Sequence, residues 1–414
     1  SFCLDFANSA DLGNDISSNN NDFTATSMTA VNQTGSSPSS AFCTWNPLRV
    51  NTQTQTFAEG NLRFSSTQTS TNPAATGNYG VSSGKFYWEV FVVAQGNTSN
   101  ILGICDTAAG LEDDTTALYA SALMYGYEFA GTKRNNNSSA SYGDSITTGD
   151  IVGVALDMDN GGVYFSKNGT FQASGDPTSG ASLTNAAFTG LNSAGSGVFQ
   201  PYYLAYSSGD GVANFGQSPT FNGQTTAGGN TDANGRGNFK HSVPSGYTAL
   251  TSANITEPSY QGIDYFAPTL YEGNGTGQRV GDFVPFTDAF NVANSAMFQH
   301  DEARALSRTA GAPSSSGGKK GTWSTWYKTA IIDTDNIFFD NGTTATNRFS
   351  LQMDASGQIV FSYAGTTILM TNADLKGGGL WRNLVLKVDT SLATASARAI
   401  MYIDGVEVTS FATD

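Results

Sequence analysis

Charged residues are scarce in this sequence: Asp, Glu, Lys and Arg make up 13% of the 414 residues, against a usual share of about 25%. Long amphipathic helices need a polar, usually charged, face, so this composition argues against them. Gly, Ser, Thr and Asn are abundant instead, and the 39% of hydrophobic residues suffice for folded cores. We therefore expect an all-β protein with many tight turns and very little helix.

Among the charged residues, the basic ones are fewer than the acidic ones. The 19 Lys and Arg against 34 Asp and Glu give a net charge of −15 and a pI of about 4.4. Nucleic acids and anionic membranes attract clustered basic residues, so we expect neither as a partner. The adjacent pairs Lys133–Arg134 and Lys319–Lys320 lie in Asn-rich and Gly-rich stretches. No apolar run is long enough to span a bilayer, and no signal peptide is visible.

Cysteine and histidine are also rare. Three cysteines exclude a disulfide framework, although Cys3 and Cys43 could form one pair. Cys105 ends an apolar segment, so we expect a buried thiol there. The two histidines, His241 and His300, lie in loop-like stretches without an evident partner, which argues against a catalytic triad.

The clearest local pattern lies between residues 149 and 171. The segments 151–156 and 163–166 are rich in β-branched and apolar residues, and 157–162 between them holds turn-forming Asp, Asn and Gly. This arrangement predicts a β-hairpin. A two-stranded ribbon this apolar is marginal in water, so we expect it inside a larger β-sandwich.

Five short motifs occur in an order that resembles a SPRY domain. They are the hairpin itself, Gly84–Val90, Ile101–Ile104, Phe199–Leu204 and Val212–Gly216. The resemblance implies that Trp88 fills the core of a sandwich and that loops at one edge form a recognition surface. The binding residues that we predict for this surface are Asn97, Asn100, Tyr125, Tyr127, Lys133, Arg134, Tyr142 and Tyr206. Asn and Ser hydrogen-bond adaptably and Tyr offers a rigid face, although ordinary surface turns have the same composition.

We predict four regions along the chain. They are an Asn- and Ser-rich extended arm (1–56) anchored by Trp45, a SPRY-like sandwich (57–250), an aromatic and Gly-rich linker (251–285) and a second β-module (286–414). In the second module, segments such as 321–328, 381–389 and 399–408 resemble a laminin-G-like jelly roll of the concanavalin A type. The fold class that we predict is thus all-β, with two concanavalin-type antiparallel sandwiches.

The combination of these modules with the segment 12–24 is similar to tail-fibre-like virion proteins of marine tailed bacteriophages. This resemblance implies a structural protein of the virion, an extracellular particle assembled in the host cytoplasm. It implies lectin-type domains that bind a host-surface glycan or protein, or other virion subunits. Two alternatives remain: a glycan-cleaving enzyme on a concanavalin-type fold, and a ligand-free decoration protein of the capsid or tail.

Metal-site patterns are weak. Asp157-x-Asp159-x-Gly161 imitates the start of a calcium loop, but its twelfth position is Asn168 where a bidentate acid is needed, so we interpret it as a hairpin turn. In the second module Asp333, Asp335 and Asp340 are the candidate ligands, because laminin-G-like domains often bind calcium through loop carboxylates. We otherwise expect no cofactor.

Catalytic patterns are weak too. Gly80-x-Ser82-x-Gly84 matches a nucleophile elbow, but it leads into a predicted strand where the elbow requires a helix. Glu89 and Glu112–Asp114 are the candidate carboxylates for glycoside hydrolysis, which needs two flanking a sugar. Glu89 falls in a structural strand motif and the acidic trio in a loop. We predict a protein that is not an enzyme.

The second module offers about half the strands of a jelly roll. We therefore expect its open edge to be covered by another chain or by residues beyond Asp414, because bare apolar edges invite pairing. The arm up to Leu48 of a neighbouring copy is the candidate cover, which predicts a homo-oligomer. We also expect the chain to be a segment of a longer protein, since it begins at Ser1 without Met.

Overall fold

The computed structural model describes most of the chain outside the predicted linker. The described residues are 1–49, 55–69, 73–110, 120–255, 269–271, 278–280, 292–298, 303–309, 319–330, 335–342, 348–375 and 379–413. They fall into two compact units: unit 1 comprises Ser1–Thr256 and Val292–Arg308, and unit 2 comprises Glu257–Asn291 and Thr309–Asp414. Unit 1 thus takes in both the predicted arm and the SPRY-like region, while the predicted boundaries at 56, 250 and 285 stay predictions.

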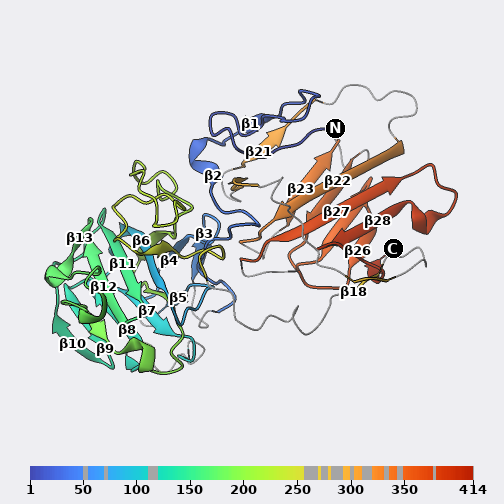
Figure 1. The fold of residues 1–414 in the computed structure, drawn as a ribbon. Helices are drawn as coiled ribbons and strands as arrows, with labels where there is room; N and C mark the ends of the chain where they lie inside the picture. The colour runs from blue at the N-terminus through green and yellow to red at the C-terminus, as the bar shows by residue number, and fades with distance from the viewer. Residues whose placement is uncertain are drawn as a thin grey trace. The chain divides into compact units, whose positions relative to one another are not determined.

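The fold is all-β, as predicted from composition (Figure 1). Within the described ranges the helical elements are single 3₁₀ turns: η1 (Ala30–Asn32), η3 (Gln172–Ser174), η4 (Gly180–Ser182), η5 (Leu191–Ser193) and η8 (Ala395–Ala397). In the part of the chain that the structure covers, no helix is long and apolar enough to cross a membrane.

Unit 1 is built on two sheets, which are antiparallel apart from one short parallel pairing. The larger follows the order β13 (Thr170–Phe171), β12 (Gly162–Lys167), β11 (Ile151–Asp157), β6 (Lys85–Ala94), β16 (Gly209–Asn214), β4 (Arg63–Ser66), β3 (Thr56–Ala58), with β14 (Phe188–Thr189) beside β12 and β17 (Thr248–Ala249) beside β6. The smaller follows the order β10 (Ser138–Ser141), β9 (Thr132–Asn135), β8 (Met124–Glu128), β7 (Ile101–Asp106), β15 (Phe199–Leu204), β5 (Ala74–Thr76).

The predicted hairpin is the pair β11–β12. Its register places Val154 opposite Phe165 and Asp157 opposite Gly162, one residue beyond the predicted strand ends. Gly161 adopts φ 75° in the turn, a conformation that glycine reaches without steric cost. Every residue of β11 is buried, because β6 and β12 flank it and both of its faces are covered.

Aromatic side chains fill the space between the two sheets. Trp88 is 1% exposed and Trp45 is fully buried, which confirms both predictions. Phe215 lies between them, with ring centroids 5.5 Å from Trp45 and 6.3 Å from Trp88. The Trp45 backbone N–H also donates to the Asn61 carbonyl at 2.9 Å. The end of the arm is therefore anchored in this core.

All three cysteines are free thiols, so Cys3 and Cys43 do not form a disulfide. Cys105 is buried as predicted, and burial raises the pKa of its thiol to about 12.

The arm pairs with residues that follow the predicted linker. Strand β1 (Thr24–Thr26) pairs with β21 (Ala305–Ser307), and β2 (Gln33–Thr34) pairs with β20 (Ser295–Ala296). The Ser295 hydroxyl donates to the Ser36 carbonyl at 2.7 Å. Within one chain the arm therefore forms ribbons inside unit 1, and its predicted exchange between copies stays a prediction.

A segment at the end of unit 1, residues 238–250, covers the outer face of the larger sheet, and we call it the strap. Phe239 and Tyr247 of the strap form a second small core with Tyr87 and Tyr164 of the sheet. Glu89 is fully buried beneath it. The Glu89 carboxylate accepts N–H bonds from Lys240 and His241, both at 2.8 Å, and the Tyr87 hydroxyl at 3.1 Å.

Unit 2 also contains two antiparallel sheets. One follows the order β22 (Lys320–Tyr327), β27 (Arg382–Asp389), β28 (Ala399–Ile403), β29 (Val406–Glu407). The other follows the order β23 (Asn336–Asn341), β24 (Phe349–Met353), β25 (Ile359–Tyr363), β26 (Thr366–Thr371), β30 (Phe411–Thr413). A separate ribbon joins β18 (Thr269–Tyr271) to β19 (Gln278–Val280).

The strands of unit 2 include all those predicted around Trp323, Phe349, Val360, Leu384 and Met401. Their inward side chains make a core of mainly aliphatic residues, which supports the predicted sandwich. The structure adds β23, β26, β29 and β30 to these, so the two sheets hold four and five strands, and the predicted shortage of strands is wrong. Whether another chain pairs with this module stays a prediction.

Replacing Trp88 with alanine should destabilise unit 1 by roughly 3 to 5 kcal/mol, because the cavity left in a close-packed core collapses only in part. Urea denaturation measures the loss. Leu48→Ala is the matched control, since Leu48 is 57% exposed and its truncation should stay within about 0.5 kcal/mol. Equal losses in the two variants would show that Trp88 does not fill the core.

Burial raises the pKa of Glu89 from 4.5 to about 7, against the lowering effect of its hydrogen bonds. A raised pKa means that folding takes up a proton, so this contribution to stability is complete below pH 4.5 and disappears as the pH rises through 7. The difference corresponds to roughly 3 kcal/mol. We expect wild type to lose stability across this range relative to Glu89→Gln, measured by urea denaturation.

The readout is the change with pH, because the amide that Glu89→Gln introduces will face a backbone N–H and lower the stability of the variant at every pH. If the free energy of unfolding changed with pH in the same way for the two proteins, from about pH 4 to about pH 8, the raised pKa of Glu89 would be refuted.

Candidate functional site

Three of the predicted binding residues lie together at one end of the sandwich in unit 1. Asn100 is fully buried and ties two connections: its amide donates to the Gln95 carbonyl and accepts the Tyr206 N–H, both at 2.6 Å. Asn97 is half-buried, and its side chain accepts the Ser99 N–H at 2.9 Å. The amide of Asn100 therefore orders the loops, and Asn97 and Tyr206 stay at the surface.

Two predicted tyrosines are buried instead of exposed. Tyr127 is fully buried, and Tyr142 is 8% exposed. Their rings meet edge to face at 5.3 Å, and the Tyr142 hydroxyl accepts the Phe165 N–H at 3.2 Å. Tyr127 of β8 and Tyr142, just past the end of β10, both belong to the core of the sandwich, so neither offers a face to a ligand.

Tyr125 and Lys133 close the side of the sandwich. The half-buried Tyr125 ring packs against Phe188 at 5.2 Å. The Lys133 ammonium donates to the Ala187 carbonyl at 2.7 Å and lies 5.3 Å from the centre of the Phe188 ring. The structure thus uses both residues to join β8 and β9 to the connection that precedes β14.

Arg134 belongs to a network centred on Glu128, which is 5% exposed. The Glu128 carboxylate accepts the Arg134 guanidinium at 2.9 Å, the Thr132 hydroxyl at 2.6 Å and the Ser139 hydroxyl at 3.2 Å. Arg134 also donates to the Asn137 side chain at 3.1 Å. One buried carboxylate therefore holds β8, β9 and β10 in register.

Several connections meet at the end of the sandwich that holds Asn97, and we call their tips the loop end: residues 96–99, 143–149, 168–170 and 206–208. Most of these residues are exposed. Gln95 joins two of the connections, since its N–H donates to the Thr148 hydroxyl at 3.0 Å and its amide donates to the Ile146 carbonyl at 2.8 Å.

Asp150 fixes two further connections of the loop end. Its carboxylate accepts the Thr147 N–H at 2.8 Å and the Asn168 amide at 2.7 Å, and it pairs with Lys167 at 3.2 Å. Burial opposes ionisation of Asp150, but these hydrogen bonds outweigh it and lower its pKa. The roles of Glu128 and Asp150 were not predicted from the sequence, although Asp150 directly precedes the predicted hairpin strand 151–156.

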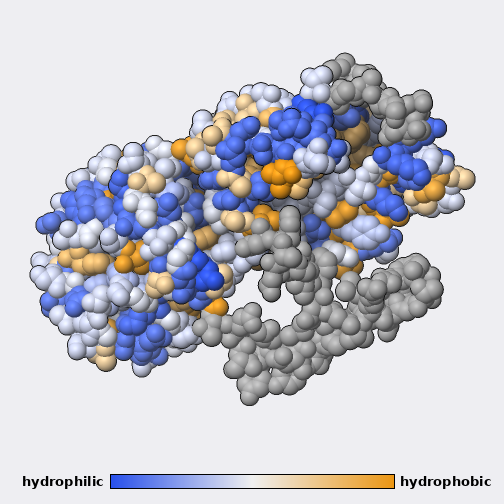
Figure 2. Space-filling model, turned by 45° about the horizontal axis from the view of Figure 1, so that its top comes forward, coloured by the Kyte–Doolittle hydropathy of each residue, from blue (hydrophilic) through white to orange (hydrophobic). Residues whose placement is uncertain are grey.

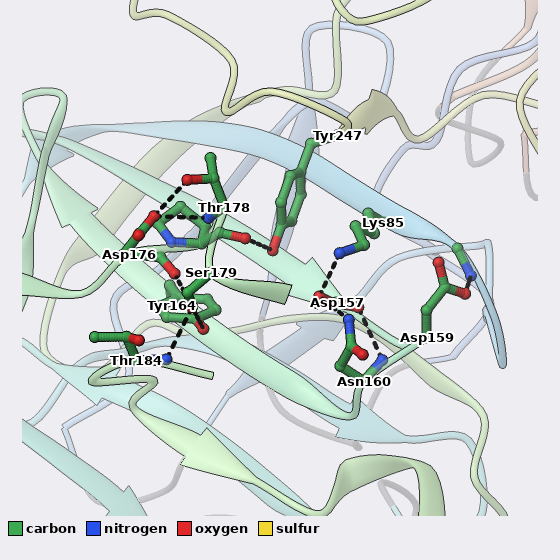
Figure 3. Close-up of polar contacts among 12 residues, drawn as sticks. Lys85, Asp157, Asp159, Asn160, Tyr164, Asp176, Thr178, Ser179, Thr184 and Tyr247 are labelled. Carbon is green, nitrogen blue, oxygen red and sulfur yellow. Dashed lines mark hydrogen bonds and ion pairs between the residues drawn. The ribbon is translucent and has the colours of Figure 1, made fainter. Parts of the chain in front are cut away.

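The calcium-like motif is a hairpin turn, as interpreted from the sequence. Figure 3 shows Asp157 accepting Lys85 at 2.8 Å and Asn160 at 2.8 and 2.9 Å. Asp159 accepts the Gly84 N–H at 2.7 Å. Both carboxylates therefore hold the turn against the start of β6.

The carboxylates proposed for calcium in unit 2 are only partly described. Asp335 accepts the Gln352 amide at 3.2 Å, and Asp340 pairs with Arg348 at 3.0 Å, whereas Asp333 lies outside the described residues. Among the residues that the structure places, no group of three or more His, Cys, Asp or Glu side chains could hold a metal. A calcium site stays a prediction.

The catalytic candidates are not brought together in the described ranges. Glu89 is buried under the strap, and the stretch around Ser82 leads into β6, a strand. Glu112–Asp114 and His300 lie outside the described residues.

Comparison with known proteins identifies part of unit 1. Residues 85–218 match the family model of the SPRY domain, a stretch that runs from β6 to just past β16. The ATP-dependent RNA helicase DDX1 of Xenopus laevis is 36% identical over 92 residues, or 22% of this chain and 11% of the helicase. Ddx1 of Drosophila melanogaster is 31% identical over 86 residues, or 21% of this chain and 11% of the helicase. The match thus spans about a tenth of each relative.

Two solved SPRY domains are among the structures to which this chain is similar. The SPRY domain of human HERC1 is 20% identical and aligns over 41% of this chain and 96% of that one, with a TM-score of 0.31. The TRIM65 PSpry domain is 13% identical over 42% of this chain and 91% of that one, also with a TM-score of 0.31. By the family match and the order of its strands, this chain contains a SPRY domain at residues 85–218.

Proposed function

We propose that this protein is a non-enzymatic binding protein whose SPRY domain holds a partner protein at the loop end. The observation that carries the proposal is that exposed loop tips are joined beneath by hydrogen bonds of buried and half-buried side chains. The connections are held on the side facing the sandwich by hydrogen bonds of Asn100, Gln95 and Asp150. Residues at the tips, such as Thr98 and Ser145, are exposed. Loops ordered before binding lose little entropy when a partner docks.

The surface chemistry supports a polar interface. The face of unit 1 visible in Figure 2 is mostly hydrophilic, with hydrophobic residues in small separate spots. Such a face suits a partner recognised by hydrogen bonds and shape.

A protein partner fits this site better than a glycan does. A sugar ring that stacks on a tyrosine needs an exposed aromatic face. Of the four tyrosines predicted for the recognition surface, Tyr127 and Tyr142 are buried. The half-buried Tyr125 ring packs on Phe188, and the half-buried Tyr206 donates its hydroxyl to the Thr69 carbonyl. The predicted host-surface glycan is therefore the weaker candidate. The predicted role as a tail-fibre-like virion protein, with a laminin-G-like second module and virion partners, stays a prediction.

The proposal is tested with a display library of random twelve-residue peptides and a glycan array, both probed with the purified chain. We expect peptide binders that weaken roughly tenfold or more with the double variant Thr98→Ala, Ser145→Ala, because two interface hydrogen bonds each contribute about 1 kcal/mol. The control is Ser82→Ala, Ser83→Ala, two exposed serines just before β6.

Three results would contradict the proposal. Glycan binding without peptide binding would favour a lectin, and reducing-sugar release would favour the glycan-cleaving alternative. Binding that falls equally in the control variant would remove the loop end as the site.

A further inference from the structure

The β9–β10 hairpin leaves part of its backbone unpaired. The strands are joined by Asn136 and Asn137 with φ of 48° and 55°, as in a two-residue type I′ turn. In such a hairpin the pair that flanks the turn, Asn135 and Ser138, is hydrogen-bonded, and bonded pairs then alternate with non-bonded ones. By this alternation Ala140 is hydrogen-bonded to Lys133 of β9. The next bonded position is Tyr142, whose N–H donates to the Gly131 carbonyl at 3.1 Å.

It follows that Ser139 and Ser141 direct their N–H and C=O groups away from β9. Strand β10 is the end strand of its sheet, and all four of its residues are exposed. In the described part of the chain, β9 is the strand that pairs with β10. Two residues thus present two donors and two acceptors at the spacing of an extended chain.

Apart from its short length, this edge carries none of the usual protective devices within the described residues. Natural edge strands are protected by Lys, by Pro, by bulges or by a covering segment. The sequence of β10 is Ser-Ser-Ala-Ser, and its register with β9 is regular. By contrast, β5 at the other end of the same sheet is fully buried.

The hairpin is also held rigidly in place. Glu128 bonds Arg134 of β9 and Ser139 of β10, and the Asn135 amide donates to the Met124 carbonyl at 2.6 Å. The edge therefore needs little ordering before it pairs.

From this geometry we infer that β10 accepts an extended, uncharged segment of the partner protein as an additional strand, hydrogen-bonded to Ser139 and Ser141. This rests on the proposed function, because β10 runs directly into residues 143–149 of the loop end. Evenly alternating donors and acceptors match a polypeptide backbone. The nearest charges are already satisfied, since Arg134 pairs with Glu128 and Lys133 bonds a carbonyl. Four hydrogen bonds alone give weak binding, and contacts at the loop end supply the rest.

The test is proline substitution of the outward positions. Ser139→Pro removes an N–H that the fold does not use and keeps the bonds of Ser138 and Ala140 to β9, as proline on an edge strand allows. Ser139→Ala is the matched control, because it loses the same Oγ contact with Glu128 but keeps the N–H. Ser141→Pro repeats the test at the second position, and circular dichroism confirms that each variant is folded.

Dissociation constants are measured for peptides selected from the random twelve-residue library. We expect at least a tenfold increase with each folded proline variant and less than a twofold change with Ser139→Ala. Peptides whose affinity falls with the Thr98→Ala, Ser145→Ala variant but is unchanged by the proline variants would overturn this inference. They would leave the proposed function standing.

Two other outcomes also decide the matter. A library that yields no binder would contradict both the inference and the proposed function. A chain that self-associates in sedimentation experiments, and loses this with Ser139→Pro, would make a second copy the occupant and overturn the choice of a partner protein.

Discussion

Packing of aromatic side chains between two β-sheets is the interaction on which the described structure of unit 1 depends. Trp45, Trp88 and Phe215 meet where the arm, β6 and the end of β16 come together. Because this core fixes the strands relative to each other, it also fixes where each connection leaves the sandwich. The packing of the core therefore determines where the loops of the loop end begin. Hydrogen bonds of polar side chains then hold the tips of these loops in place.

The sequence predicted the elements well where local chemistry decides them. The β11–β12 hairpin followed from β-branched residues around an Asp- and Gly-rich turn, and the burial of Trp88 followed from a strand motif. The same logic gave the strands of unit 2 around Trp323 and Leu384. In each case residues close in sequence carry the signal.

Burial of the predicted binding residues could not be predicted in the same way. Alternation along a strand separates two faces but does not say which of them is covered, so Tyr127 and Tyr142 were assigned to the surface. The role of Glu89 depends on partners distant in sequence, the N–H groups of Lys240 and His241. A single sequence carries no mark of such long-range bonds.

The proposed function requires a loop end that is ordered before any partner binds. Hydrogen exchange of the free protein tests it most directly at the amides of Gln95, Thr147 and Tyr206, each of which donates to a side chain. We expect exchange at these amides to be slowed by about a hundredfold or more relative to an unstructured peptide. Exchange at the rate of an unstructured peptide in these three amides, with the β-strands still protected, would contradict it.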